Sequence, residues 1–233
     1  MIRTGLEPVA VLGMITIGQA PRNDVAPYVQ RQLEGRARLH QAGALDGWSA
    51  AEIADKLAPV PGGYTLTSRL ADGSAAVVAR DKVLPLVQEK IDAMEASGIR
   101  QILLLCTGVF PGLRTGSSFL IEPDRILTPS VAALAGGRRL GVICPLEEQA
   151  DSLGDKFGGH GLSPVFAAAS PYTGTADHFE QAGRAMRDKA DLLLLDCMGY
   201  TEQHRERIAR ASGLPVILSN SLMGKLVSEI IAY

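Results

Sequence analysis

Two short apolar runs that each end at a cysteine constrain the fold of this chain most strongly. Residues 102–106 form a continuous apolar run ending at Cys106, and residues 192–197 form a second run, interrupted by Asp196, that ends at Cys197. Runs of this kind suit parallel strands that helices cover on both faces. The sequence therefore predicts an α/β fold with parallel sheets.

Segments with strand and helix patterns alternate along the rest of the chain. The expected strands are residues 9–17, 39–44, 102–106, 139–144, 163–168, 192–197 and 216–218, and the expected helices are 25–35, 49–57, 81–97, 126–134, 147–157, 177–189, 204–212 and 222–232. Residues 64–70 and 75–79 flank an Asp72-Gly73 pair, which predicts a β-hairpin. Ser49 followed by Glu52 predicts a capping box at a helix start.

The two cysteine segments resemble each other and suggest two related halves. Each is a helix, then an apolar strand, then a Cys-x-Gly sequence, which indicates at most a two-fold duplication. The break in pattern at residues 129–138 predicts a domain boundary there. We expect an N-terminal domain of residues 1–130 that carries the hairpin and a C-terminal domain of residues 137–220, with helix 221–233 packing back on the first domain.

Both cysteines stand where open α/β sheets bind their ligands, beyond the carboxyl ends of strands. The small residues that follow leave backbone N–H groups free, so we expect a lowered thiol pKa at Cys106 and Cys197. A thiolate and a thiol on opposite walls of a cleft would serve as base and acid for a carbon acid. The alternative is that the cysteines only fill space at strand ends, the role expected for Cys144.

The amino-acid composition argues against nucleic acids and membranes as binding partners. The 233 residues carry a formal net charge of −2 and are 46% hydrophobic, which is typical of a globular protein and not of a nucleic-acid binder. No apolar run is long enough to span a bilayer, and the segment around Glu7 and Pro8 lacks the apolar core of a secretory signal. With three cysteines and no export signal, we expect reduced thiols in the cytoplasm.

Motifs for metals and nucleotide cofactors are missing. His40, His160 and His178 share no ligand spacing with the cysteines or with each other, and neither a Walker sequence nor a G-x-G-x-x-G motif after the first strand is present. We therefore expect no metal and no cofactor, no nucleic-acid or membrane partner, and a small anionic molecule as the substrate.

Five stretches make the chain resemble the AroM family over nearly its whole length. They are residues 16–24, 119–127, 141–148, 195–199 and 215–220. The organisation is similar to the aspartate/glutamate/hydantoin racemase superfamily. That resemblance implies two Rossmann-like halves related by a pseudo-two-fold axis, an active site in the cleft between them, two catalytic cysteines, no cofactor and a possible homodimer.

The chain departs from the usual racemase motifs at three places. Those racemases usually show Cys-Asn-Thr at the first cysteine, where this chain has Cys106-Thr107-Gly108. Their second site often reads Gly-Cys-Thr, where this chain has Asp196-Cys197-Met198. Glutamate racemase carries Asp-Ser-Gly after its first strand, whereas this chain has no carboxylate there. These departures leave the substrate open.

Further candidate residues follow the strands. Arg22 would hold a substrate carboxylate in a bidentate fork, or else be a solvated first-turn residue, and Thr16 and Gln19 would supply neutral donors. Thr107 and Gly108 would contribute backbone N–H groups to an oxyanion site. The remaining candidates for the pocket are Met198, Gly199, Tyr200, Ser219 and Asn220.

For four further positions the sequence also allows a purely structural or surface role. Ser219 and Asn220 would either cap the last helix or bind an anion beside its N-terminus. Arg114 and His204 are expected at the surface.

Together these observations predict a cofactor-independent racemase or isomerase that moves a Cα proton of a small carboxylate or hydantoin-like substrate. One alternative is a decarboxylase-like enzyme in which a single cysteine acts as an acid. The other is a small-molecule sensor on the same scaffold, since a fold alone does not determine a function.

Overall fold

The first half of the chain forms a four-stranded parallel sheet in the computed structural model, which describes residues 10–231. Its strands are β1 (Ala10–Thr16), β2 (Ala37–Gly43), β5 (Gln101–Leu105) and β6 (Phe119–Ile121), in the order β2-β1-β5-β6. Helix α3 (Arg80–Ala96) packs on one face through Val83, Val87 and Ile91, and α1 (Ala26–Gln32) packs on the other through Val29. Residues 9, 232 and 233, included in the expected terminal strand and helix, lie outside the described residues.

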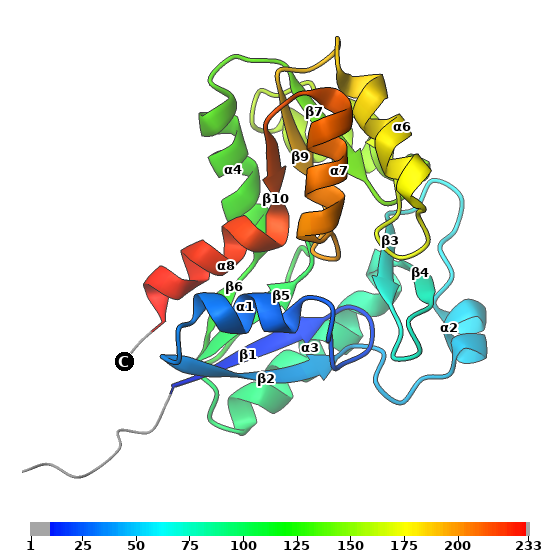
Figure 1. Cartoon of the computed structure of the whole chain (residues 1–233). Coiled ribbons are helices and arrows are strands. Elements are labelled where there is room, and N and C mark those ends of the chain that lie inside the picture. Colours follow the sequence, from blue (N-terminus) through cyan, green and yellow to red (C-terminus); the bar gives the residue numbers. More distant parts are fainter. Residues whose placement is uncertain (1–9, 232–233) are drawn as a thin grey trace, which may run out of the picture.

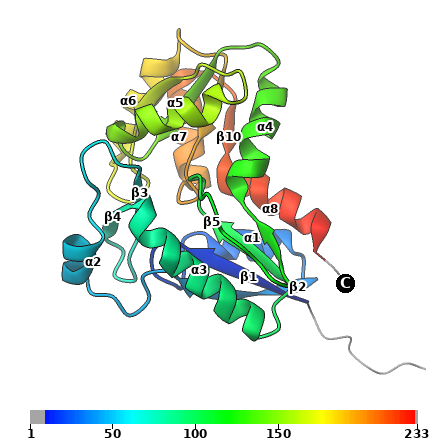
Figure 2. The same ribbon diagram turned by 180° about the vertical axis from the view of Figure 1, so that it is seen from behind.

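The second half repeats this arrangement. Its strands are β7 (Leu140–Cys144), β8 (Val165–Ala168), β9 (Leu192–Leu195) and β10 (Val216–Leu218), in the order β10-β9-β7-β8. Helices α6 (Ala176–Met186) and α7 (Glu202–Ser212) pack on one face, and α5 (Ala150–Gly158) packs on the other, after a short 3-10 turn, η1 (Glu147–Gln149). Figures 1 and 2 show the two halves one above the other.

The strand order is the same in both halves. In chain order, the second strand lies at one edge, followed across the sheet by the first, the third and the fourth. Cys106 follows β5 and Cys197 follows β9, so both cysteines follow the third strand of their half. The prediction of two similar α/β halves with parallel sheets is confirmed.

Each half is covered in part by a helix that follows the last strand of the other. Helix α4 (Pro123–Ala135) follows β6, yet its Val131 packs with Leu140 and Val142 of the second sheet. Helix α8 (Ser219–Ile230) follows β10, yet its Met223 and Val227 pack in the core of the first sheet, beside α1 (Figure 1). The two halves therefore share their cores.

The segment around residues 119–138 differs from its expected structure. Residues 119–121 form β6, a three-residue strand that is too short for a periodic pattern to indicate. Helix α4 begins at Pro123, because proline is pre-organised for the first helical position, and not at residue 126. Pro129 lies inside this helix, so the helix runs through most of the predicted break and ends one residue past the expected end, before left-handed Gly136 with φ 53°.

The hairpin and the helix before it match their expected structures. Strands β3 (Thr65–Arg69) and β4 (Ala75–Ala79) pair antiparallel, and α2 (Ala50–Lys56) begins with the predicted capping box. The Ser49 hydroxyl accepts the Glu52 N–H at 3.2 Å, and the Glu52 carboxylate accepts the Ser49 N–H at 2.9 Å. Most of β3 is buried, because this strand reaches over the carboxyl ends of the parallel strands.

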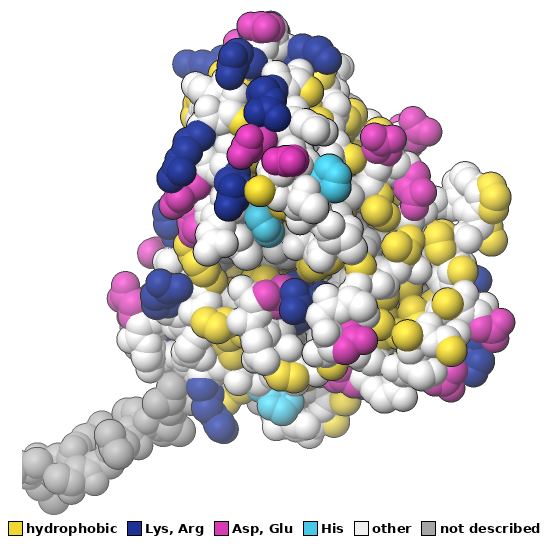
Figure 3. All heavy atoms as spheres, turned by 45° about the vertical axis from the view of Figure 1, so that its right-hand side comes forward, with side chains coloured by type: hydrophobic (Ala, Val, Ile, Leu, Met, Phe, Trp, Pro, Cys, Tyr) yellow, Lys and Arg dark blue, Asp and Glu magenta, His cyan; other side chains and the backbone are white. Residues whose placement is uncertain are grey.

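Charged side chains of both signs are interspersed on the face shown in Figure 3, and no continuous basic stripe crosses it. Apolar side chains gather on the part of this face that holds α2 and the hairpin, where Val60 and Val77 are exposed. Among residues 10–231, no helix is both long enough and apolar enough to cross a membrane.

The packing of α8 predicts that the last helix stabilises the first half. Met223→Ala removes a fully buried side chain and should lower the free energy of unfolding in urea by about 2–5 kcal/mol. Lys225→Ala, an exposed position on the same helix, should change it by less than about 0.5 kcal/mol. Equal effects of the two substitutions would contradict the packing described for α8.

Candidate active site

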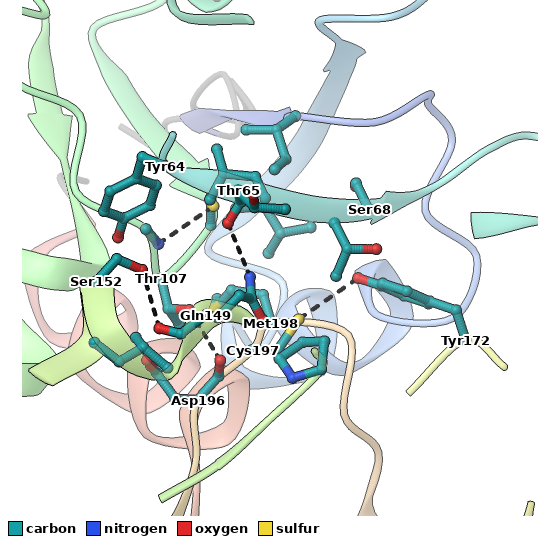
Figure 4. A pocket seen from close by; sticks show the side chains of 18 residues that line it. Tyr64, Thr65, Ser68, Thr107, Gln149, Ser152, Tyr172, Asp196, Cys197 and Met198 are labelled. Atoms are coloured by element: carbon teal, nitrogen blue, oxygen red, sulfur yellow. Dashed lines mark hydrogen bonds between the residues drawn. The ribbon is translucent and has the colours of Figure 1, made fainter. Parts of the chain in front are cut away.

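One small cavity lies between the two halves at the carboxyl ends of β5 and β9. It has a volume of about 30 Å³, and both Cys106 and Cys197 line it. Strand β3 closes it on one side and η1 and the start of α5 on another (Figure 4). The polar and aromatic side chains that line it include Tyr64, Thr65, Thr67, Ser68, Gln149, Ser152 and Tyr172.

The two thiols share one local motif. The Gly108 N–H donates to Cys106 Sγ at 3.3 Å, and the Gly199 N–H donates to Cys197 Sγ at 3.4 Å. The free N–H groups expected from the sequence are therefore present at both cysteines, but the expected lowering of the thiol pKa is wrong. Burial raises the pKa of Cys106 to about 12 and also raises that of Cys197, because desolvation outweighs one amide hydrogen bond.

Tyr172 adds a second polar contact at Cys197 only. Its hydroxyl lies 3.6 Å from Cys197 Sγ, and Figure 4 shows the ring entering the pocket from the side opposite Tyr64. Gly199 makes this approach possible, since a Cβ at that position would collide with the Tyr172 hydroxyl. No sequence pattern indicated a role for Tyr172, which lies in the turn after β8.

Arg22 is buried beside this pair and is already occupied. Its Nε and Nη2 donate to the two Asp24 carboxylate oxygens at 2.9 and 2.8 Å, and Nη1 donates to Thr16 Oγ1 at 3.1 Å. The guanidinium also lies over the Tyr172 ring, 5.7 Å from its centroid. Burial alone would raise the pKa of Asp24, but the hydrogen bond and charge of Arg22 lower it. Arg22 is only 2% exposed, so the alternative of a solvated residue is wrong.

A buried ion pair joins the loops that carry the two cysteines. Lys156 Nζ, on α5, donates to the Asp196 carboxylate at 3.0 and 3.2 Å and to the Thr107 carbonyl oxygen at 2.8 Å. It also lies 3.8 Å from Asp124 Oδ1. The side chains of Lys156 and Asp196 are 2% and 1% exposed. Sequence reasoning missed this pair, although a carboxylate that ends an apolar strand calls for a buried partner.

Several predicted binding residues hold loops in place instead of facing the cavity. Gln19 Nε2 donates to the carbonyl oxygens of Leu45 and Trp48, and its Oε1 accepts the Ala71 N–H. Among the predicted residues, Thr107, Gly108 and Met198 line the cavity with the two cysteines. Thr16, whose Oγ1 also accepts the Gly18 N–H at 3.3 Å, does not.

Ser219, Asn220 and Tyr200 support the loop after Cys197 from behind. Ser219 Oγ donates to the Leu195 carbonyl at 2.7 Å, and Asn220 Nδ2 donates to the carbonyl oxygens of Met198 and Tyr200 at 3.0 and 2.6 Å. Tyr200 is fully buried, and its hydroxyl donates to the Ala169 carbonyl at 2.8 Å. Neither Ser219 nor Asn220 makes a side-chain cap at the start of α8.

The remaining predicted residues lie apart from the cavity. Cys144 is buried in the second core, and its thiol donates to the Leu146 carbonyl oxygen at 3.3 Å. Arg114 is exposed. The surface prediction for His204 is wrong, because its ring is half-buried and stacks on Phe179 with centroids 4.2 Å apart. In the part of the chain that the structure describes, no three His, Cys, Asp or Glu side chains are grouped to hold a metal ion.

The model of the AroM protein family matches residues 12–231. The chain belongs to the AroM family. No functionally curated protein matches its sequence. The match covers both halves of this AroM protein, both cysteines and the buried ion pair.

Solved structures of racemases and of a decarboxylase share the fold. Glutamate racemase from Aquifex pyrophilus superposes with a TM-score of 0.62 at 14% identity, over 95% of this chain and 84% of that one. Picrophilus torridus aspartate racemase gives 0.56 at 13%, over 94% of each chain. An arylmalonate decarboxylase gives 0.57 at 18%, over 96% of this chain and 92% of that one. At these identities the likeness establishes the fold.

The ion pair predicts a strong coupling between Lys156 and Asp196. Lys156→Met leaves a buried carboxylate without its partner and should lower the free energy of unfolding in urea by about 3–5 kcal/mol. Adding Asp196→Leu should recover part of this loss, leaving a deficit of about 1–3 kcal/mol because the Thr107 carbonyl lacks its donor. A double variant less stable than Lys156→Met would show that the charges are not coupled.

Proposed function

We propose that this AroM protein is a cofactor-independent isomerase of the racemase type. In this proposal Cys106 and Cys197 exchange the proton on an acidic carbon of a small carboxylate or hydantoin-like compound. The observation that carries it is that both thiols line one cavity and follow the equivalent strand of each half. The wider racemase-like fold supports the same reaction class.

The proton steps balance without any co-reactant. One thiolate takes the proton from the substrate carbon, so that an S–H bond forms while the electron pair of the broken C–H bond moves into the adjacent carbonyl as an enolate. The opposite thiol then gives its proton to the other face of the carbon, where the enolate pair forms the new C–H bond. The second sulfur is left as the thiolate, and the configuration at carbon is inverted.

The enolate charge would be held by neutral donors. The buried cations near the two thiols, Arg22 and Lys156, are already paired, Arg22 with Asp24 and Lys156 with Asp196. Thr67 and Ser68 line the cavity and carry hydroxyl groups for this role, whereas the hydroxyl of Thr65 already donates to the Gly63 carbonyl oxygen at 3.4 Å. Fixed donors in a water-poor site stabilise developing charge strongly, and this contribution usually dominates the barrier.

Burial of the thiols changes their strength as bases as well as their ionisation. A raised pKa lowers the fraction of thiolate at neutral pH, and it also makes the thiolate that forms a stronger base. A carbon acid adjacent to one carbonyl needs such a base. The raised pKa at Cys106 and Cys197 is therefore compatible with proton removal from carbon.

Substrate entry requires the cavity to open. Its volume of about 30 Å³ holds little more than a water molecule, whereas binding pockets for drug-sized ligands are roughly 300–1,000 Å³. Gln149 Nε2 donates to the Thr65 carbonyl oxygen at 3.1 Å, which ties η1 of the second half to β3 of the hairpin. We propose that this contact breaks when substrate enters and re-forms when the site closes.

A decarboxylase is the second candidate, and the asymmetry of the site favours it. Tyr172 contacts Cys197, and among residues 10–231 no hydroxyl contacts Cys106 in this way, so one thiol would act alone as an acid on an enolate formed by loss of CO₂. The likeness to arylmalonate decarboxylase supports this alternative. The sensor alternative, a homodimer and a cytoplasmic location stay predictions.

The isomerase proposal predicts that proton exchange needs both thiols. In D₂O, with a panel of amino acids, hydantoins and hydroxy or dicarboxylic acids, NMR should show deuterium entering the α-position of one compound. Cys106→Ser and Cys197→Ser should each slow this exchange by about 10²–10⁴-fold, since each removes one acid–base group.

Cys144→Ser is the matched control, because this buried thiol does not line the cavity, and exchange should be unchanged. Exchange that survives either of the other two substitutions would overturn the two-thiol mechanism. Loss of CO₂ from a malonate derivative that depends on one cysteine only would establish the decarboxylase instead.

A further inference from the structure

The two thiols have equivalent positions but different polar neighbours. Each accepts one backbone N–H, from Gly108 at Cys106 and from Gly199 at Cys197. Within the part of the chain that the structure describes, only Cys197 of the two has a second hydrogen-bonding partner, the Tyr172 hydroxyl at 3.6 Å. A thiolate is stabilised by each donor that points at the sulfur, so the second donor distinguishes the two sites.

The charged and titratable groups around Cys197 come from five segments. Arg22, from the loop before α1, attracts a negative sulfur, and Asp196, which precedes Cys197, repels it. The Tyr172 hydroxyl contacts the sulfur from the turn after β8. Cys106 faces it from the first half, and the buried groups Cys144 and Tyr200 lie within its electrostatic reach.

One cation and one carboxylate act on Cys106 as well. Lys156 attracts a negative sulfur there, but its ion-pair partner Asp196 repels it. Tyr64 is also within electrostatic reach, but its hydroxyl accepts the Val109 N–H at 3.2 Å and makes no hydrogen bond to Cys106. A thiolate at Cys106 would therefore have the Gly108 N–H as its hydrogen-bond donor.

The Tyr172 hydroxyl is positioned to donate. Among residues 10–231, Cys197 Sγ is its one hydrogen-bond partner, and the Arg22 guanidinium lies over the ring. Burial, and then the neighbouring Cys197, raise the pKa of Tyr172 well above its ordinary value, so the phenol keeps its proton while the thiol titrates. Once Cys197 has lost its proton, only the tyrosine can supply the hydrogen of this contact.

We propose that Cys197 is the thiol that ionises first, and that Tyr172 is a positioning residue whose hydroxyl donates to its thiolate. Gly199 is required for the same contact, because only glycine leaves room for the Tyr172 hydroxyl beside the Cys197 sulfur. Together with the proposed isomerase function, on which this step rests, the order of ionisation assigns the roles of the two thiols in the resting enzyme. Cys197 is then the base, Cys106 is the acid, and the enantiomer whose C–H bond faces Cys197 reacts at the lower pH.

The test follows each thiol of the full chain separately and uses no substrate. Iodoacetamide is applied over a series of pH values, and mass spectrometry of the digest quantifies alkylation at Cys106, Cys144 and Cys197. The midpoint of each profile reports ionisation independently of how fast the reagent enters. The Cys197 midpoint should lie below that of Cys106. Tyr172→Phe should raise the Cys197 midpoint by about one pH unit, which is tenfold less thiolate at lower pH, and leave Cys106 unchanged.

Tyr200→Phe is the matched control, because it removes a hydroxyl from another buried tyrosine of the same half that donates to Ala169 and not to a thiol. Its Cys197 midpoint should be unchanged. Three results would each overturn the proposal. They are a Cys106 midpoint below that of Cys197, an unchanged Cys197 midpoint in Tyr172→Phe, and an equal shift of the Cys197 midpoint in Tyr200→Phe. If Tyr172→Phe does not fold, the order of the two midpoints in the unmodified chain still decides which thiol ionises first.

The outcome is separable from that of the isomerase proposal. If the expected titration is found and no compound exchanges its α-proton, the ionisation order stands and the proposed reaction fails. If exchange needs both thiols and the Tyr172→Phe profile is unmoved, the reaction stands and the role of Tyr172 fails.

Discussion

A single buried ammonium group determines how the two halves meet. Lys156 reaches from α5 to the Asp196 carboxylate, one residue before Cys197, and to the Thr107 carbonyl, one residue after Cys106. An unpaired charge at such a depth costs several kcal/mol, so the fold is most stable when all three groups stay together. The separation of the two cysteine loops is therefore set by a contact that neither sulfur makes. The cavity, the β3–β4 hairpin and the carboxyl ends of β5 and β9 all lie next to this contact.

The backbone of the site is duplicated, whereas its chemistry is not. The same strand order and the same Cys-x-Gly turn occur in both halves, and each glycine donates to its own sulfur. Around that repeat, Cys197 has Tyr172 and Arg22, and Cys106 has the Lys156–Asp196 pair. A reaction that removes a proton from one face of a carbon and adds a proton to the other face needs an acid–base group within reach of each face. One of these two groups must be deprotonated while the other is protonated. In the proposed isomerase reaction, the duplicated backbone would supply the reach, and the unequal neighbours of the two sulfurs would supply the difference in protonation.

The sequence predicted the scaffold well because its signals are local. Apolar runs, the Asp72-Gly73 turn and the Ser49–Glu52 capping box each depend on adjacent residues, and each matches the structure. What it missed depends on contacts between distant segments. In the sequence, Lys156 resembles any other helical lysine, and only the folded chain brings it to Asp196. Tyr172 likewise contacts Cys197 from a turn that is distant in the sequence. The thiol pKa was predicted in the wrong direction because a motif shows the N–H donor but not the burial.

The exchange of α4 and α8 between the halves bears on whether this protein can be divided. A cut after Gly136 would leave the first fragment with a bare apolar sheet face where α8 lies, and would remove α4 from the second. Each fragment would keep the core on one face of its sheet and lose part of the cover on the other face, although together they hold every piece. A split gene should therefore yield two fragments that are insoluble when expressed separately and that assemble when expressed together. An insertion at the same point would preserve the pairing, since the two helices remain in one chain.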